Sequence, residues 1–120
     1  MATLSRGRRS NGWVETFRAA DAWVVAAWEA SAAMAPGSAE LARQLRRGAL
    51  DCGSALVAAA QCGGGEEGRE YIQRARARLL EARYLLYLSK RFGSIDAKRY
   101  KTLSLRLERA LRDVNVRRAV

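Results

Sequence analysis

Three short turn signals divide the chain into four segments, and this division constrains the fold more than any other feature of the sequence. The signals are Ala35-Pro36-Gly37, Gly63-Gly64-Gly65 and Gly93, and Pro36 is the only proline among 120 residues. Proline and glycine clusters end helices, since proline lacks the amide donor and glycine has the greatest backbone freedom to lose. Between the signals, apolar residues recur at spacings of three and four, as they do on one face of an α-helix. The sequence therefore predicts four helices and little or no β-structure.

The predicted helices cover residues 13–34, 38–61, 66–92 and 96–117, and residues 1–12 are expected to form a flexible basic tail. Each helix carries one apolar stripe for a common core. The stripes are Trp13, Phe17, Ala20, Val24, Ala27, Ser31 and Met34; Leu41, Leu45, Ala49, Cys52, Leu56 and Ala59; Ile72, Ala75, Leu79, Ala82, Leu86 and Ser89; and Tyr100, Leu103, Leu107, Ala110 and Val114. Four such helices joined by short loops predict an all-α, up-down-up-down antiparallel four-helix bundle.

The residue types present exclude most catalytic and metal chemistry. The chain has no histidine, which is the commonest general base and metal ligand, so we expect no enzyme activity, no metal and no cofactor. Cys52 and Cys62 would lie ~15 Å apart on one helix, too far for a disulfide. We read both thiols as reduced, which is typical of a cytoplasmic protein. The longest uncharged apolar run is far shorter than the ~20 residues of a membrane span, so no membrane partner is expected.

The charge points to a polyanionic partner. Lys and Arg number 22 against 12 Asp and Glu, a net charge of +10. Residues 83–118 hold eleven of the bases and only three acids, so this segment supplies most of the excess. Such an array suits phosphate backbones. No motif that reads base sequence is present, so RNA or DNA would be bound with little sequence preference.

The third helix carries the most specific signals. Arg69, Arg76, Arg83 and Lys90 recur every seven residues and form a row on one face. The candidate nucleic-acid-binding residues are Arg69, Arg76, Arg83, Lys90, Arg91, Lys98, Arg99, Lys101, Arg106, Arg109 and Arg112, with Arg46 and Arg47 as weaker candidates. Alternatively, these arginines cover core edges or pair with acids, and i,i+4 pairs are available at Glu70–Arg74 and Glu108–Arg112.

A second apolar set lies on the third helix, nearly opposite its core stripe. It consists of Leu80, Tyr84, Tyr87 and Leu88. In a monomeric bundle this face should be polar, so the set predicts an interface between protomers. The alternative is an ordinary scatter of surface aromatics, which is common in proteins.

Residues 77–111 resemble the third and fourth helices of the Avd proteins, the accessory variability determinants of diversity-generating retroelements. The resemblance rests on Arg83-Tyr84, Phe92, Ile95 and Arg99-Tyr100. Residues 41–60 are similar to the second helix shared with the intervening-sequence proteins of large-subunit ribosomal RNA, most clearly at Gln44-Leu45-Arg46-Arg47. The chain lacks the Asn-Ile-Ala-Glu-Gly segment of the ribosomal-insert proteins and the closing Gly-Gly-Trp of Avd.

The resemblance implies a homopentamer of four-helix bundles with no catalytic activity of its own. Avd-like proteins associate with the retroelement reverse transcriptase and bind RNA and DNA through a basic surface, supporting mutagenic cDNA synthesis. The alternative is a bundle of the ribosomal-insert type, with a structural or protein-interaction role.

Overall fold

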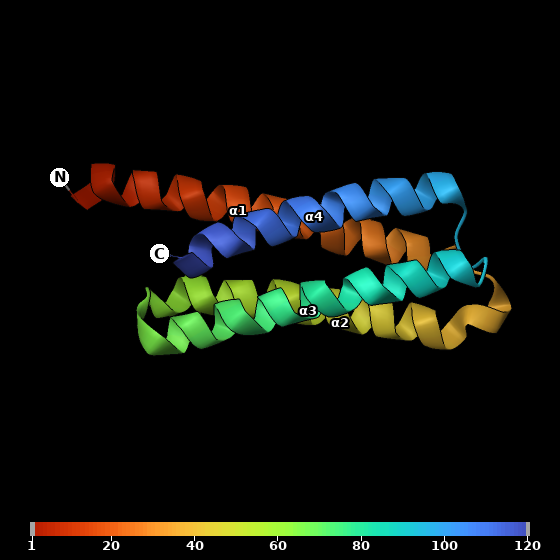
Figure 1. The fold of residues 1–120 in the computed structure, drawn as a ribbon. Helices are drawn as coiled ribbons and strands as arrows, with labels where there is room; N and C mark the ends of the chain where they lie inside the picture. The colour runs from red at the N-terminus through yellow and green to blue at the C-terminus, as the bar shows by residue number, and fades with distance from the viewer. Residues whose placement is uncertain (1, 120) are drawn as a thin grey trace.

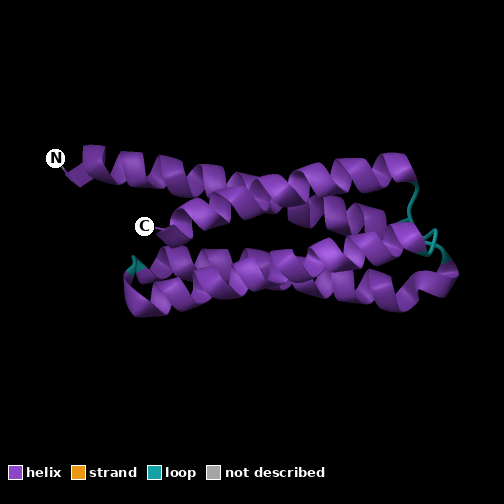
Figure 2. Ribbon diagram, viewed as in Figure 1, coloured by secondary structure: helices purple, strands orange, loops and turns teal. Residues whose placement is uncertain are grey.

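The protein is all-α in its computed structural model, which describes the backbone of residues 2–119 and the side chains of residues 12–118. The four helices are α1 (Ala2–Ala32), α2 (Ala39–Cys62), α3 (Gly65–Arg91) and α4 (Ala97–Ala119), and a single 3-10 turn, η1 (Pro36–Ser38), precedes α2. Residues 2–119 contain no strand (Figure 2). The predicted all-α class with four helices is confirmed.

The helices end where the turn signals stand. Gly63 and Gly93 adopt positive φ angles of 67° and 74°, a conformation that strongly favours glycine, just past the ends of α2 and α3. Asp96 begins α4 as an N-cap, since its carboxylate accepts a hydrogen bond from the Arg99 amide at 2.7 Å.

The α1 helix differs from the expected range. It begins at Ala2, so the backbone of the segment predicted as a basic tail continues the helix without a break. The side chains of residues 1–11 lie outside the described part of the chain. At its other end α1 stops at Ala32, two residues before the predicted Met34.

The helices pack in a closed cycle, in which α1 contacts α2, α2 contacts α3, α3 contacts α4, and α4 contacts α1. The α2–α3 turn lies at one end of the molecule and the other two connections lie at the opposite end (Figure 1). The molecule measures 54 × 24 × 20 Å. Consequently α1 and α3 occupy opposite corners, as do α2 and α4, and four separate seams run along the surface.

The core uses the predicted stripes of α2, α3 and α4, apart from Leu41 and Tyr100, which are half-buried. The prediction for α1 is wrong at Phe17, which is 42% exposed, whereas Trp23 is fully buried. The inward face of α1 is rotated toward Trp23, in a core where twelve of the 24 buried apolar residues described are alanines. One large indole fills space that several alanines leave.

Candidate nucleic-acid interface

Exposed lysines and arginines of α4 line a groove between α4 and α1. Three adjoining hollows, of about 370, 400 and 440 Å³, follow this seam. The first and second hollows share Arg106, and the second and third share Glu15 and Arg109, so the three hollows adjoin along one seam. We call it the α1/α4 groove. From Arg99 to Arg112 it extends ~20 Å along the helix axis.

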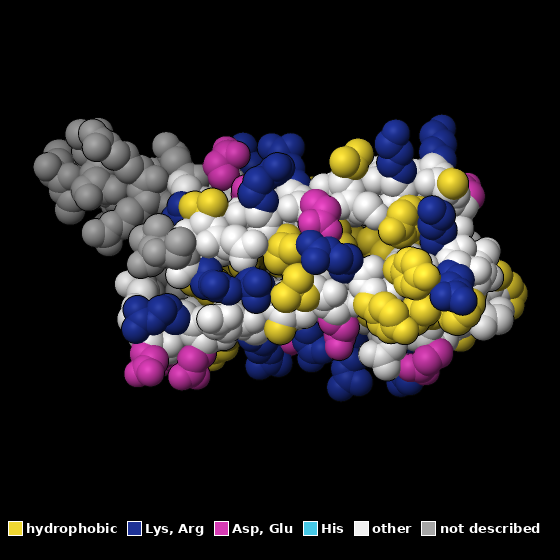
Figure 3. All heavy atoms as spheres, viewed as in Figure 1, with side chains coloured by type: hydrophobic (Ala, Val, Ile, Leu, Met, Phe, Trp, Pro, Cys, Tyr) yellow, Lys and Arg dark blue, Asp and Glu magenta, His cyan; other side chains and the backbone are white. Residues whose placement is uncertain are grey.

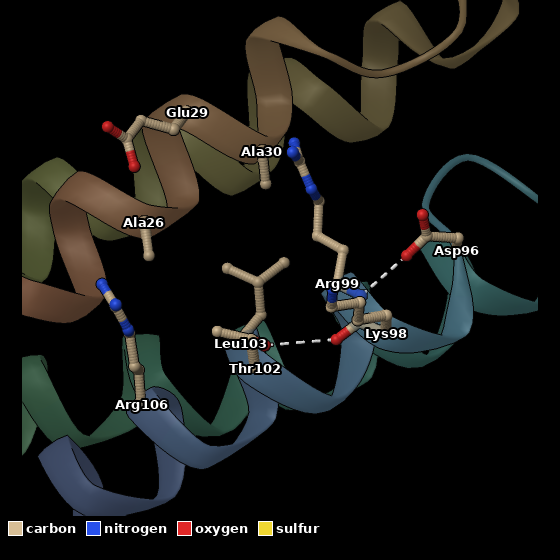
Figure 4. Close-up of a pocket in the computed structure, with 9 residues that line it drawn as sticks. All are labelled: Ala26, Glu29, Ala30, Asp96, Lys98, Arg99, Thr102, Leu103 and Arg106. Carbon is tan, nitrogen blue, oxygen red and sulfur yellow. Dashed lines mark hydrogen bonds between the residues drawn. The ribbon is translucent and has the colours of Figure 1, made fainter.

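The two walls of the groove differ in chemistry. The α4 wall carries Lys98, Arg99, Arg106, Arg109 and Arg112. The α1 side contributes Ala19, Ala22, Ala26 and Ala30, whose small side chains leave the space above them open. Arg99 and Arg106 extend from α4 toward α1, over Ala30 and Ala26 (Figure 4). Their guanidinium groups can therefore meet a ligand lying along the seam.

Two of the three acids in residues 83–118, Asp96 and Glu108, are already engaged, and the third, Asp113, lines the groove. The Asp96 carboxylate caps α4, and Glu108 accepts two hydrogen bonds from Arg83 across the other seam of α4. Glu15 and Glu29 line the groove from α1. Among the described residues, none of the lysines and arginines of α4 has a carboxylate within 4.0 Å. The positive charge of the groove is therefore not neutralised by ion pairs.

The predicted row of basic residues on α3 faces α4, and three of its four side chains already contact residues of α4. Arg83 donates to Glu108 from Nε at 2.8 Å and from Nη2 at 2.7 Å, and this pairing lowers the pKa of the Glu108 carboxyl. Arg76 donates to the side-chain oxygen of Asn115 at 2.8 Å. Lys90 lies 4.8 Å above the ring of Tyr100, a cation–π contact. Arg69, at the N-terminal end of the row, is exposed.

The remaining candidates lie away from the groove. Arg91 donates to the Tyr87 hydroxyl at 3.1 Å. Arg46 lies 5.7 Å from the centre of the Trp28 ring and donates to the Ser31 hydroxyl at 3.3 Å. The exposed side chains of Arg47 and Lys101 line none of the three hollows. The structure thus brings five of the thirteen candidates together on α4 and distributes the other eight over other surfaces.

The expected pairs within single helices are replaced by pairs between helices. Arg74 bonds Asp51 of α2 at 2.7 and 3.0 Å instead of Glu70, and Arg78 bonds the same carboxylate at 2.6 Å. Glu108 pairs with Arg83 instead of Arg112. Hydrogen bonds from Arg74, then from Arg78, lower the pKa of Asp51. The pairs Glu70–Arg74 and Glu108–Arg112, which the spacing makes available, do not form, because tertiary packing gives Arg74 and Glu108 partners on other helices.

Replacing Asp51 with asparagine should reduce the free energy of unfolding by about 1 kcal/mol at pH 7, because Arg74 and Arg78 then repel each other without a shared counter-charge. The lowered pKa of Asp51 makes this stabilisation complete above the unfolded pKa near 3.8 and removes it as the pH falls through the lower folded value. Urea unfolding of both proteins at several pH values measures the difference. A gap that persists undiminished near pH 2 would contradict the assignment.

The set predicted as a protomer interface lies on the outer side of α3. Tyr84 and Tyr87 are 60% and 46% exposed, and their rings stack with centroids 6.4 Å apart. Leu80 and Leu88 are half-buried, and Leu80 also packs against the core of its own protomer. We call these four residues the α3 aromatic face. Apolar side chains gather over α3 and α4 near the turn that joins them, with basic side chains around them (Figure 3).

The described residues contain no group of three or more potential metal ligands and no helix long and apolar enough to cross a membrane. Burial, and secondarily the charge of Asp51, raises the pKa of the Cys52 thiol to about 12, so this thiol stays protonated at neutral pH. Cys62 is also a free thiol.

Comparison with protein-family models, curated proteins and solved structures gives no match.

Sequence reasoning identified the bases of the α1/α4 groove but not the groove. The missing signal is the set of small residues on α1, Ala19, Ala22, Ala26 and Ala30, which recur at helical spacings on the side that meets α4. Two further arginines line the groove and were not among the candidates. Arg18 comes from α1, and Arg117 lies 5.9 Å from the centre of the Trp13 ring.

Proposed function

We propose that this protein is a non-enzymatic, oligomeric nucleic-acid-binding accessory protein, built as an up-down-up-down antiparallel four-helix bundle. In line with its resemblance to Avd, it would act in the cytoplasm with the reverse transcriptase of a diversity-generating retroelement and support mutagenic cDNA synthesis on an RNA template. The observation that carries nucleic-acid binding is the row of α4 arginines without carboxylate partners beside the alanine-lined side of the α1/α4 groove.

The groove suits a phosphate backbone. A guanidinium presents a planar fork of donors that matches two phosphate oxygens, and it remains charged at any physiological pH. Arg99, Arg106 and Arg109 follow one another along the same wall of the groove, so phosphates of one strand lying in it can reach several arginines. No aromatic ring lines the three hollows, so bases have nothing to stack on there. The expected binding is to phosphates, with little preference for sequence.

Oligomerisation is the second part of the proposal, and the exposed α3 aromatic face supports it. The homopentamer that the resemblance implies would multiply the groove fivefold, and a repeated basic surface raises the affinity for a long polyanion by avidity. Light scattering coupled to gel filtration tests this part. A particle of 13.3 kDa at every concentration would contradict it.

Binding to a generic single-stranded RNA should depend steeply on salt. With ~6 phosphate contacts to a single strand, affinity should fall roughly 300-fold between 50 and 200 mM salt, because each contact releases condensed counterions. Fluorescence anisotropy of a labelled oligonucleotide across a salt series measures this directly. An affinity that does not change with salt would show that phosphate contacts do not drive binding.

The exposed Tyr84–Tyr87 pair also fits a second candidate, a protein-interaction bundle of the ribosomal intervening-sequence type without a nucleic-acid role. Genomic context distinguishes the two. A neighbouring reverse transcriptase gene with template and variable repeats supports the first, and an insertion within a ribosomal RNA gene supports the second.

A further inference from the structure

An apolar groove runs between α1 and α2, on a side of the molecule that carries neither the α1/α4 groove nor the α3 aromatic face. Its hollow, about 370 Å³, is lined by Phe17, Asp21, Val24, Leu50, Gly53, Ser54 and Val57. We call this the α1/α2 groove. Phe17, Leu50 and Val57 are 42%, 50% and 47% exposed. Three exposed apolar side chains therefore gather on one seam, and clusters of this kind are typical of interaction sites.

The hollow is not needed for α1 to pack on α2. A Cβ atom at Gly53 would meet the Val24 side chain at 3.6 Å, an ordinary van der Waals distance, so alanine would fit there without moving α1. The missing side chain instead leaves the floor of the groove low. A ligand that lies above the seam could therefore approach the helix backbone closely at Gly53.

The α3 aromatic face has the opposite shape and charge. Its tyrosines project outward from α3, the helix at the opposite corner from α1. Residues 83–91, which contain Tyr84, Tyr87 and Leu88, hold three bases and no acid. In contrast, the residues that line the α1/α2 groove include one acid, Asp21, and no lysine or arginine. Asp21 lines the α1/α2 groove and has no lysine or arginine nitrogen within 4.0 Å among the described residues.

We propose that the α1/α2 groove receives the α3 aromatic face of a second copy of this chain. The tyrosines of one protomer would cover Phe17, Leu50 and Val57 of the next, and Lys90 or Arg91 would approach Asp21. Because the two surfaces differ, the contact is heterologous and repeats around a ring or along a chain. The α1/α4 groove belongs to neither surface, so it stays open to nucleic acid in the assembly.

This inference rests on the oligomeric part of the proposed function and not on nucleic-acid binding. The salt series tests phosphate contacts, whereas the experiment below tests only which surfaces join protomers. Failure of one leaves the other standing.

The test uses two single variants of exposed residues, V57D in the α1/α2 groove and Y84D on the α3 aromatic face. Each variant alone should be a monomer of about 13.3 kDa by light scattering, because each lacks one half of the contact. Mixed in equal amounts, they should form a dimer of twice that mass. V57D keeps an intact α3 aromatic face, and Y84D keeps an intact α1/α2 groove, so the two can form one contact with each other. The altered groove of V57D and the altered face of Y84D then remain at the ends of the dimer and prevent further growth.

L105D on α4 is the matched control. Leu105 is as exposed as Tyr84 and lies outside both surfaces, so L105D should keep the wild-type mass. Circular dichroism checks that all three variants stay helical, and Y84F, which keeps the ring, should assemble like the wild type. Three results would overturn the proposal: a V57D variant that assembles normally, a V57D and Y84D mixture that stays monomeric, or a wild-type protein that is monomeric throughout.

Discussion

Replacing Trp23 with alanine should lower the free energy of unfolding by about 3–5 kcal/mol, the range observed when a buried aromatic side chain is removed. Trp23 is the largest fully buried side chain of the described core, and the residues that share this core include several alanines. Small neighbours cannot close around the cavity, because they have no rotamers that reach into it. Against a total of roughly 5–15 kcal/mol for a domain, such a loss brings the protein close to unfolding at 37 °C. Urea unfolding followed by far-UV circular dichroism measures the change.

Two further variants serve as controls: one removes an exposed tryptophan, and the other removes only the indole N–H of Trp23 and part of its volume. Trp28 is 43% exposed, so W28A should change the free energy of unfolding by only about 0.5 kcal/mol. The indole N–H of Trp23 is buried without a hydrogen-bond acceptor among the described residues, and an unpaired donor costs ~1–3 kcal/mol. W23F removes that donor, which offsets part of the lost packing, and should cost about 1 kcal/mol or less. A W23F variant as unstable as W23A would contradict the assignment of an unpaired donor.

The sequence was sufficient for the elements of the fold because local chemistry decides them. Gly63 and Gly93 end helices through backbone angles that favour glycine, and Asp96 begins one through its own carboxylate. Apolar spacing placed the core faces of α2, α3 and α4 correctly. It was misleading for α1, because Phe17 and Trp23 both fall on plausible stripes of a helix that is apolar on more than one side. Which of them turns inward depends on the sizes of side chains on other helices.

The candidate site was predictable in composition but not in arrangement. An arginine can reach any acid within several ångströms, and proximity in the fold is not encoded by spacing along one helix. Arg74 therefore pairs with Asp51, 23 residues away, and not with Glu70. In the same way, Arg83 pairs with Glu108 of α4. The lysines and arginines of α4 then have no carboxylate within 4.0 Å among the described residues. The sequence showed an excess of positive charge. Only the tertiary structure showed which lysines and arginines have no carboxylate partner and can therefore contact a ligand.

A triple variant of the α1/α4 groove is the strongest test of whether its arginines contact nucleic acid. Changing Arg99, Arg106 and Arg109 to glutamine removes three candidate phosphate contacts while keeping polar side chains of similar length. The affinity for single-stranded RNA at 50 mM salt should fall roughly 10- to 100-fold, and the slope of log affinity against log salt should become shallower by ~2. Stability should change little, because all three side chains are exposed and form no ion pair. Fluorescence anisotropy across the salt series gives both numbers.

The matched control removes the same charge elsewhere. Arg43, Arg74 and Arg78 pair with Glu40, Asp51 and Glu81, so the glutamine triple at these positions changes net charge equally without touching the groove. Its affinity should fall less than about threefold and its salt slope should stay close to the wild-type value, since only long-range attraction is reduced. Equal losses in the two triples would mean that nucleic acid responds to total charge alone. The alanine-lined side and the arginine wall of α1 and α4 would then have no special role in binding.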